Sequence, residues 1–234
     1  MTMIFVLATA GAVFAAGDSR QFPTLAEDRQ KVYLVGNDAL IAEGGVGVIP
    51  DAGPNGEPWD ALAELKQIAR DTQMGPFAEQ LDAITKKYTV SFGGALSRFS
   101  EVIRTDPPSK ITLFFVKRDA ESRVYVAIRD FDVRSLPLGD GKWRHYLELV
   151  APQVKSNGAI LAPDQIQAYW TVPPGCTVNV AAAPPIPKEN IAGWIRDLMR
   201  SVASQSPQCA AQIGGPILVA TVDANGARWL PENN

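Results

Sequence analysis

The feature that most constrains the fold is an uncharged run near the start of the chain, Ile4 to Ala16. Its residues are apolar at consecutive positions instead of alternating with polar ones, and Ala10-Gly11 lies near its middle. A run without alternation predicts strands that are covered on both faces, and the glycine predicts a turn between them. We therefore predict two buried strands, Ile4–Leu7 and Ala12–Ala16, paired as a hairpin.

The same run has an alternative interpretation as the apolar core of a secretory signal peptide, because it ends in small residues. Only Met-Thr-Met precedes it, so the positively charged segment of a signal peptide is missing, and the first charged residues, Asp18 and Arg20, follow it. The run is also too short and too interrupted for a membrane-spanning helix. These features favour the hairpin over a removable segment of residues 1–16.

Strand and helix signals alternate along the rest of the chain. Turn residues between apolar runs predict strands, here Lys31–Val35, Ala39–Ala42, Ile111–Lys117, Val124–Val133, Trp143–Val150, Ala168–Val172, Ile217–Val222 and Ala227–Leu230. Apolar spacing of three and four predicts amphipathic helices, here Pro58–Ile68, Phe77–Tyr88, a short segment over Ala95–Arg104, and Ile191–Val202. This order predicts a single α+β domain over residues 1–234 with helices outside the sheets, because each apolar stripe must be buried.

The composition excludes several kinds of chemistry. With 22 basic and 25 acidic residues and a net charge of −3, the chain has no electrostatic reason to bind nucleic acid or an anionic membrane. The single histidine, His145, and the two cysteines cannot form a zinc cluster, so we expect no metal and no cofactor. His145 lies in a strand-like stretch and is predicted to be a strand residue. Cys176 and Cys209 are predicted to be ordinary buried thiols, or a disulfide if the compartment is oxidising.

Thr2 carries the most distinctive chemistry. Removal of the initiator methionine would leave a threonine with a hydroxyl and a free α-amine of pKa about 7.7–8.0, a nucleophile and a base in one residue. Such a site also needs a cation, a carboxylate that holds the cation, and backbone N–H groups for an oxyanion. The predicted hairpin returns Asp18 to the start of the first strand, Lys31 begins the next strand, and Glu43–Gly47 offers unhindered amides.

These residues also have plain structural interpretations. Asp18 could simply end a strand, and Lys31 could be a solvated lysine beside Asp28. Gly44, Gly45 and Gly47 could form no more than a flexible turn.

In these residues and their spacing, the chain resembles the proteasome-like N-terminal nucleophile hydrolases. That family includes proteasome β-subunits and a bacterial peptidase ring that works with an unfolding ATPase. The resemblance covers the beginning and the end of the chain, whereas the middle matches only in the order of elements. The matching positions are Thr2, Ile4, Gly11, Val13, Ala16-Gly17-Asp18, Lys31-Val32, Asn37-Asp38, Ile41-Ala42, Asp51-Ala52, Gly214-Gly215 and the turn from Asp223 to Gly226.

The resemblance implies a four-layer αββα sandwich, with two sheets face to face and helices outside, and hydrolysis of amide bonds. It makes Thr2 the nucleophile, Lys31 the cation that lowers the amine pKa, and Asp18 the carboxylate that orients Lys31. It also implies a ring-shaped homo-oligomer in the cytoplasm that acts on peptides or proteins, and a possible unfolding ATPase as partner.

The oxyanion donor is less well matched. The glycine of the family follows an alanine directly, whereas Glu43 intervenes here, so Gly44 is the first candidate and Gly45 the second.

A further departure lies ahead of Gly214. The family places an Asp and a Ser there, and this chain has Cys209–Ile213, so that Ser204 or Ser206 would have to serve instead. A non-catalytic protein of the same fold is therefore the main alternative. An exported binding domain without residues 1–16 is the second.

Overall fold

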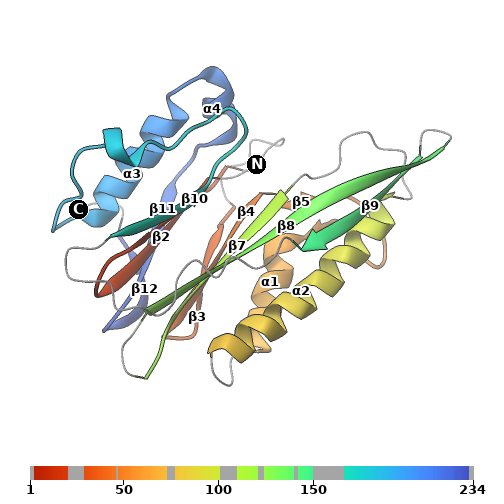
Figure 1. The fold of residues 1–234 in the computed structure, drawn as a ribbon, viewed down its shortest axis with the longest axis horizontal. Coiled ribbons are helices and arrows are strands. Elements are labelled where there is room, and N and C mark those ends of the chain that lie inside the picture. Colours follow the sequence, from red (N-terminus) through yellow and green to blue (C-terminus); the bar gives the residue numbers. More distant parts are fainter. Residues whose placement is uncertain are drawn as a thin grey trace.

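The computed structural model describes residues 3–20, 29–45, 47–72, 77–100, 110–120, 124–139, 142–149 and 166–231. This part of the chain combines helices with antiparallel sheets, as predicted for an α+β protein (Figure 1). The first sheet has the order β10-β1-β2-β11-β12. It contains β1 (Ile4–Ala8), β2 (Ala12–Asp18), β10 (Gln167–Thr171), β11 (Ile217–Asp223) and β12 (Gly226–Leu230).

The second sheet has the order β3-β4-β7-β8-β9. It contains β3 (Val32–Val35), β4 (Ala39–Gly45), β7 (Lys110–Arg118), β8 (Val124–Gly139) and β9 (Lys142–Leu149), and two short strands, β5 (Val48–Ile49) and β6 (Trp59–Asp60), pair separately. The helices are α1 (Ala61–Arg70), α2 (Phe77–Ser100), α3 (Ile191–Ala203) and α4 (Pro207–Gln212), with a 3₁₀ turn at Val180–Ala182. In the ranges described, none of these helices has both the length and the apolar character needed to cross a membrane.

The predicted N-terminal hairpin is confirmed. Strand β1 pairs with β2 on one side and with β10 on the other, so that Phe5 lies between Ala16 and Trp170. All five residues of β1 are buried. Strand β1 and most of β2 therefore belong to the interior of this sheet.

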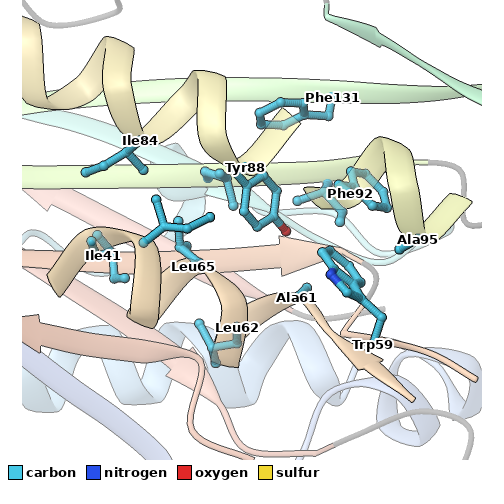
Figure 2. Close-up of a cluster of buried hydrophobic side chains, with 14 of the residues drawn as sticks. Ile41, Trp59, Ala61, Leu62, Leu65, Ile84, Tyr88, Phe92, Ala95 and Phe131 are labelled. Carbon is cyan, nitrogen blue, oxygen red and sulfur yellow. The ribbon is translucent and has the colours of Figure 1, made fainter. Parts of the chain in front are cut away.

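Three hydrophobic clusters hold the helices and sheets together. The first lies between α1, α2 and the second sheet and includes Ile41, Leu65, Tyr88, Phe92 and Phe131 (Figure 2). The second lies between α3 and the first sheet and includes Phe5, Leu7, Ile195, Met199 and Val219. The third joins the two sheets and includes Ile4, Val6, Val32, Leu40 and Phe114. Residues of β1 alternate between the second and third clusters, which explains the run without polar residues.

An aromatic group in the first cluster fixes the strand that leads into α1. The ring of Trp59 stacks on Phe92 (Figure 2), with 5.1 Å between the ring centroids. Its Nε1 donates to Ser91 Oγ at 3.0 Å. Trp59 is therefore anchored on α2, which places its neighbour Asp60 at the start of α1.

Helix α1 begins at Ala61, and the prediction that it begins at Pro58 is wrong. The Oδ1 atom of Asp60 accepts hydrogen bonds from the N–H groups of Leu62 (2.9 Å) and Ala63 (2.8 Å). This capping satisfies backbone donors that the first turn leaves free, so the helix starts after Asp60.

Helix α2 is continuous where the sequence predicted two segments. It passes through Gly93 and Gly94 because Phe92, Ala95 and Leu96 continue its buried stripe. A glycine costs a helix about 1 kcal/mol relative to alanine, less than the burial of one large apolar side chain. Strand β8 likewise extends beyond the predicted end because its partner β9 pairs with it as far as Gly139.

The prediction that the two cysteines are ordinary thiols is wrong. Cys176 and Cys209 form a disulfide, with 5.8 Å between their Cα atoms. It ties the irregular segment after β10 to α4. Disulfides persist mainly in oxidising compartments. The bridge therefore favours the interpretation of the cysteines as a disulfide formed in an oxidising compartment.

Removal of the disulfide by Cys176→Ala and Cys209→Ala is expected to lower the free energy of unfolding by roughly 3–4 kcal/mol. The bridge spans a sequence separation of 33 residues, and its loss frees that loop in the unfolded chain. Urea unfolding measures the difference, and a reducing agent should destabilise only the unmodified protein. Equal midpoints for both proteins under oxidising conditions would contradict this expectation.

Candidate active site

Asp18 and Lys31 form a buried ion pair. Lys31 Nζ lies 3.0 Å from Asp18 Oδ2, and the two side chains are 1% and 0% exposed. Asp18 ends β2 in the first sheet, and Lys31 precedes β3 in the second, so the pair joins the two sheets. The alternative of a solvated Lys31 is therefore wrong.

Backbone donors around Asp18 place the pair at the start of β1. Met3 N–H donates to Asp18 Oδ1 at 2.9 Å, and Gly214 N–H donates to Oδ2 at 3.3 Å. The N–H of Asp18 in turn donates to the carbonyl oxygen of Met3 at 3.4 Å. Thr2, the predicted nucleophile, lies outside the described residues, and its neighbour Met3 touches the predicted carboxylate.

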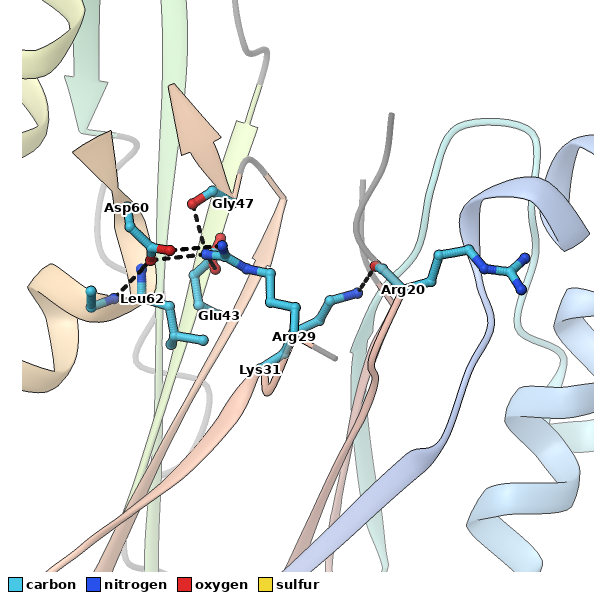
Figure 3. Close-up of polar contacts among 8 residues, drawn as sticks. Arg20, Arg29, Lys31, Glu43, Gly47, Asp60 and Leu62 are labelled. Atoms are coloured by element: carbon cyan, nitrogen blue, oxygen red, sulfur yellow. Dashed lines mark hydrogen bonds and ion pairs between the residues drawn. The ribbon is translucent and has the colours of Figure 1, made fainter. Parts of the chain in front are cut away.

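Lys31 is held from two further directions. Its Nζ donates to the carbonyl oxygen of Arg20 at 2.5 Å (Figure 3). Its own carbonyl oxygen accepts a hydrogen bond from the N–H of Glu43 at 3.1 Å. The first contact holds the ammonium group next to the end of β2, and the second pairs the Lys31 backbone with β4.

Burial opposes the charge on both members of the pair. It raises the pKa of Asp18, an effect that the Lys31 ammonium and the N–H groups of Met3 and Gly214 reduce. It lowers the pKa of Lys31, against the opposing effects of Asp18 and Glu43. A lysine with a lowered pKa exchanges a proton with a neighbouring amine more readily than a solvated lysine does.

Gly44 brings β4 close to the first sheet. A Cβ atom at this position would collide with Cγ2 of Thr171 and would lie 3.3 Å from Cγ1 of Ile4. Only glycine therefore allows β4 to pass the start of β1 and the end of β10 at this distance.

The alternation of donors along β4 implies that Gly45 N–H faces the segment that carries Lys31. Donors along a strand alternate between its two neighbours, and Glu43 donates toward that side. Gly45 follows Glu43 by two residues in β4. It lies past the point where β3 begins, at Val32. Its φ of +122° also favours glycine.

A second charged group lies next to the pair, and the sequence analysis missed most of it. Glu43 is 2% exposed and sits 4.0 Å from Nη2 of Arg29, which pairs with Asp60 (Figure 3). Burial raises the pKa of Glu43 to about 7, although Arg29 and Lys31 lower it. One signal in the sequence could have found it, because Glu43 follows the apolar run Ala39–Ala42 in a strand covered on both faces.

The supporting serines have other roles. Ser204 Oγ donates to the carbonyl oxygen of Arg200 at 2.9 Å, at the end of α3. Ser206 caps α4, and its Oγ accepts a hydrogen bond from the N–H of Cys209 at 3.1 Å. The first of the paired glycines contributes its backbone to the site, because Gly214 N–H donates to Asp18.

His145 lies in β9, opposite Ser135, as predicted for a strand residue. Across the ranges that the structure describes, no group of three or more His, Cys, Asp or Glu residues is arranged to hold a metal ion.

A comparison with models of known protein families finds no match to this chain, and a comparison with curated proteins finds no similar sequence.

Proposed function

We propose that the chain is an N-terminal threonine hydrolase that cleaves amide bonds in peptides or proteins, of the proteasome-like N-terminal nucleophile type. The observation that carries the proposal is the buried Asp18–Lys31 pair, whose carboxylate binds the N–H of Met3 directly after Thr2. Buried ion pairs add little to stability because desolvation offsets their attraction. A catalytic role gives a reason for this pair and for its position.

In the proposed reaction, Thr2 Oγ attacks the carbonyl carbon of the substrate while its proton passes to the α-amine. Lys31 lowers the pKa of that amine, and Asp18 keeps Lys31 in place. The C–N bond then breaks, the leaving amine takes the proton, and an ester remains on Thr2. Water attacks the ester, the carboxylic acid leaves, and the Oγ proton is restored.

Two glycine amides are candidates for the oxyanion site. Gly45 N–H is directed toward the Lys31 side of β4, whereas the alternation of donors directs Gly44 N–H toward β7. We therefore prefer Gly45 to Gly44 as the donor. Gly44 provides the close approach of β4 to β1.

We also propose that the fold is the four-layer αββα sandwich of that family. The three hydrophobic clusters support this arrangement, because one lies between the sheets and the other two lie between a sheet and its helices. A ring-shaped homo-oligomer and an unfolding ATPase follow from the resemblance alone. The disulfide counts against the cytoplasmic location that the resemblance implies.

A non-catalytic protein of the same fold is the second candidate. It is favoured by one observation: the segment Cys209–Ile213 has neither the Asp nor the Ser that the family places there. The hydroxyls of Ser204 and Ser206 are used at helix ends.

Labelling of Thr2 separates the two candidates. We expect intact-mass analysis to show loss of the initiator methionine and one covalent adduct with a threonine-directed electrophile. Thr2→Ser keeps the hydroxyl and the amine and should still be labelled, whereas Thr2→Ala lacks the nucleophile and should lose both labelling and hydrolysis. An unmodified protein that starts at Thr2 and forms no adduct would favour the non-catalytic candidate.

A further inference from the structure

The glycine-rich segment is formed by Gly44 and Gly45 at the end of β4 and by Gly47, whose backbone is held from two sides. The carbonyl oxygen of Gly47 accepts hydrogen bonds from Arg29 Nη2 at 2.7 Å and from Ala61 N–H at 3.1 Å. Glycines have no side chain to pack and have the largest backbone freedom of any residue. These two contacts therefore decide where the segment ends.

Asp60 fixes the guanidinium group of Arg29. Arg29 Nη1 lies 2.8 Å from Asp60 Oδ2, and Nη2 lies 3.0 Å from Oδ1 (Figure 3). The same carboxylate caps α1 through Leu62 and Ala63. The position of the guanidinium is thus set by the start of a helix, and the Arg29 side chain is only 9% exposed.

Arg29 also contacts the strand that carries the catalytic carboxylate. Its backbone N–H donates at 3.1 Å to the carbonyl oxygen of Ser19, the residue after Asp18. A Cβ atom at Gly47 would lie 2.9 Å from Cζ and Nε of Arg29, so the guanidinium lies against the glycine backbone. One residue therefore contacts the end of β2, the glycine-rich segment and the start of α1.

We propose that Arg29 is a positioning residue that holds Gly47, and with it the glycine-rich end of β4, in place next to the segment that carries Lys31. Its effect on catalysis rests on the proposed function, whereas its effect on the backbone does not. Lysine cannot replace it, because a single ammonium group cannot meet two carboxylate oxygens and a carbonyl oxygen in one plane.

Kinetics of Arg29 variants test the catalytic part. In Arg29→Lys and Arg29→Ala, kcat on a peptide that the unmodified protein cleaves is expected to fall about 100-fold with little change in KM, as for a misplaced catalytic group. Millimolar guanidinium should restore part of the kcat of Arg29→Ala, and ammonium should not. The matched control is Arg228→Lys in another two-point pair, Arg228–Asp223, and it should leave kcat unchanged.

Amide hydrogen exchange tests the backbone part without any need for activity. The N–H of Ala61, which donates to the carbonyl oxygen of Gly47, should exchange about 5- to 10-fold faster in the Arg29 variants, the factor expected for one weakened hydrogen bond. If Arg29→Ala does not fold, Arg29→Lys, which keeps a charge opposite Asp60, carries both measurements.

Hydrogen exchange and kinetics together test the positioning role of Arg29 separately from the proposed hydrolase activity. Unchanged exchange in Arg29→Lys, or an unchanged kcat, would overturn the positioning role. If the unmodified protein neither cleaves peptides nor is labelled, the proposed function fails, and hydrogen exchange alone decides whether Arg29 holds the segment.

Discussion

The Lys31→Met protein is expected to be roughly 3–5 kcal/mol less stable than the unmodified protein, because the Asp18 carboxylate would remain buried without its counter-ion. Asp18→Asn should have an effect of similar size, since it leaves the Lys31 ammonium buried and unpaired. Urea unfolding at neutral pH measures both free energies. Arg200→Met is the control, because it breaks the Arg200–Asp197 pair, whose side chains are 65% and 78% exposed, and should cost about 1 kcal/mol or less.

The double variant Asp18→Asn/Lys31→Met separates folding from catalysis. With neither charge left unpaired in the interior, it should recover most of the stability that each single variant loses. Hydrolysis should nevertheless stay at least 10²- to 10⁴-fold below that of the unmodified protein, the usual range for loss of acid–base assistance. A stable double variant with normal hydrolysis would remove both residues from the proposed reaction.

Glu43→Gln is expected to stabilise the protein above pH 7 by roughly 3 kcal/mol, because the folded state holds Glu43 at a pKa of about 7 against an ordinary value of 4.5. Between these two pH values the unfolded chain releases the Glu43 proton while the folded chain keeps it. The stability of the unmodified protein therefore falls as the pH rises through this window and levels off above it. Burial causes the raised pKa, and Asp60 adds to it, whereas Arg29 and Lys31 act in the opposite direction.

The difference between the two proteins should thus be small at pH 4.5 and largest above pH 7. Comparing their unfolding free energies at each pH cancels the contributions of the other titrating groups. Glu79→Gln, at an exposed position in the first turn of α2, is the control and should follow the unmodified protein across the range. A constant difference between Glu43→Gln and the unmodified protein would show that Glu43 keeps the same protonation in both states.

The candidate site was predictable only in part. Asp18 and Lys31 could be named because the hairpin returns the chain to its start and the next strand begins nearby. Arg29 and Asp60 could not, because their roles depend on a contact between two segments that are far apart in the chain. The part played by Gly214 could not be read either, since it acts through its backbone N–H, which every residue except proline has.

The sequence by itself determined the elements whose pattern is local. The run from Ile4 to Ala16 required strands covered on both faces, and the apolar spacing after Ile191 required an amphipathic helix; both are found in the structure. These patterns depend only on neighbouring residues and on the period of the strand or the helix.

Tertiary contacts decided the remaining features. Helix α1 starts at Ala61 because Asp60 caps it, and α2 continues through Gly93-Gly94 because the second sheet buries its stripe. Cys176 meets Cys209 because α4 packs beside the segment after β10. Lys31 is buried and not solvated for the same reason: its partner, Asp18, belongs to the other sheet, and only the packing of the two sheets brings the charges within 3.0 Å.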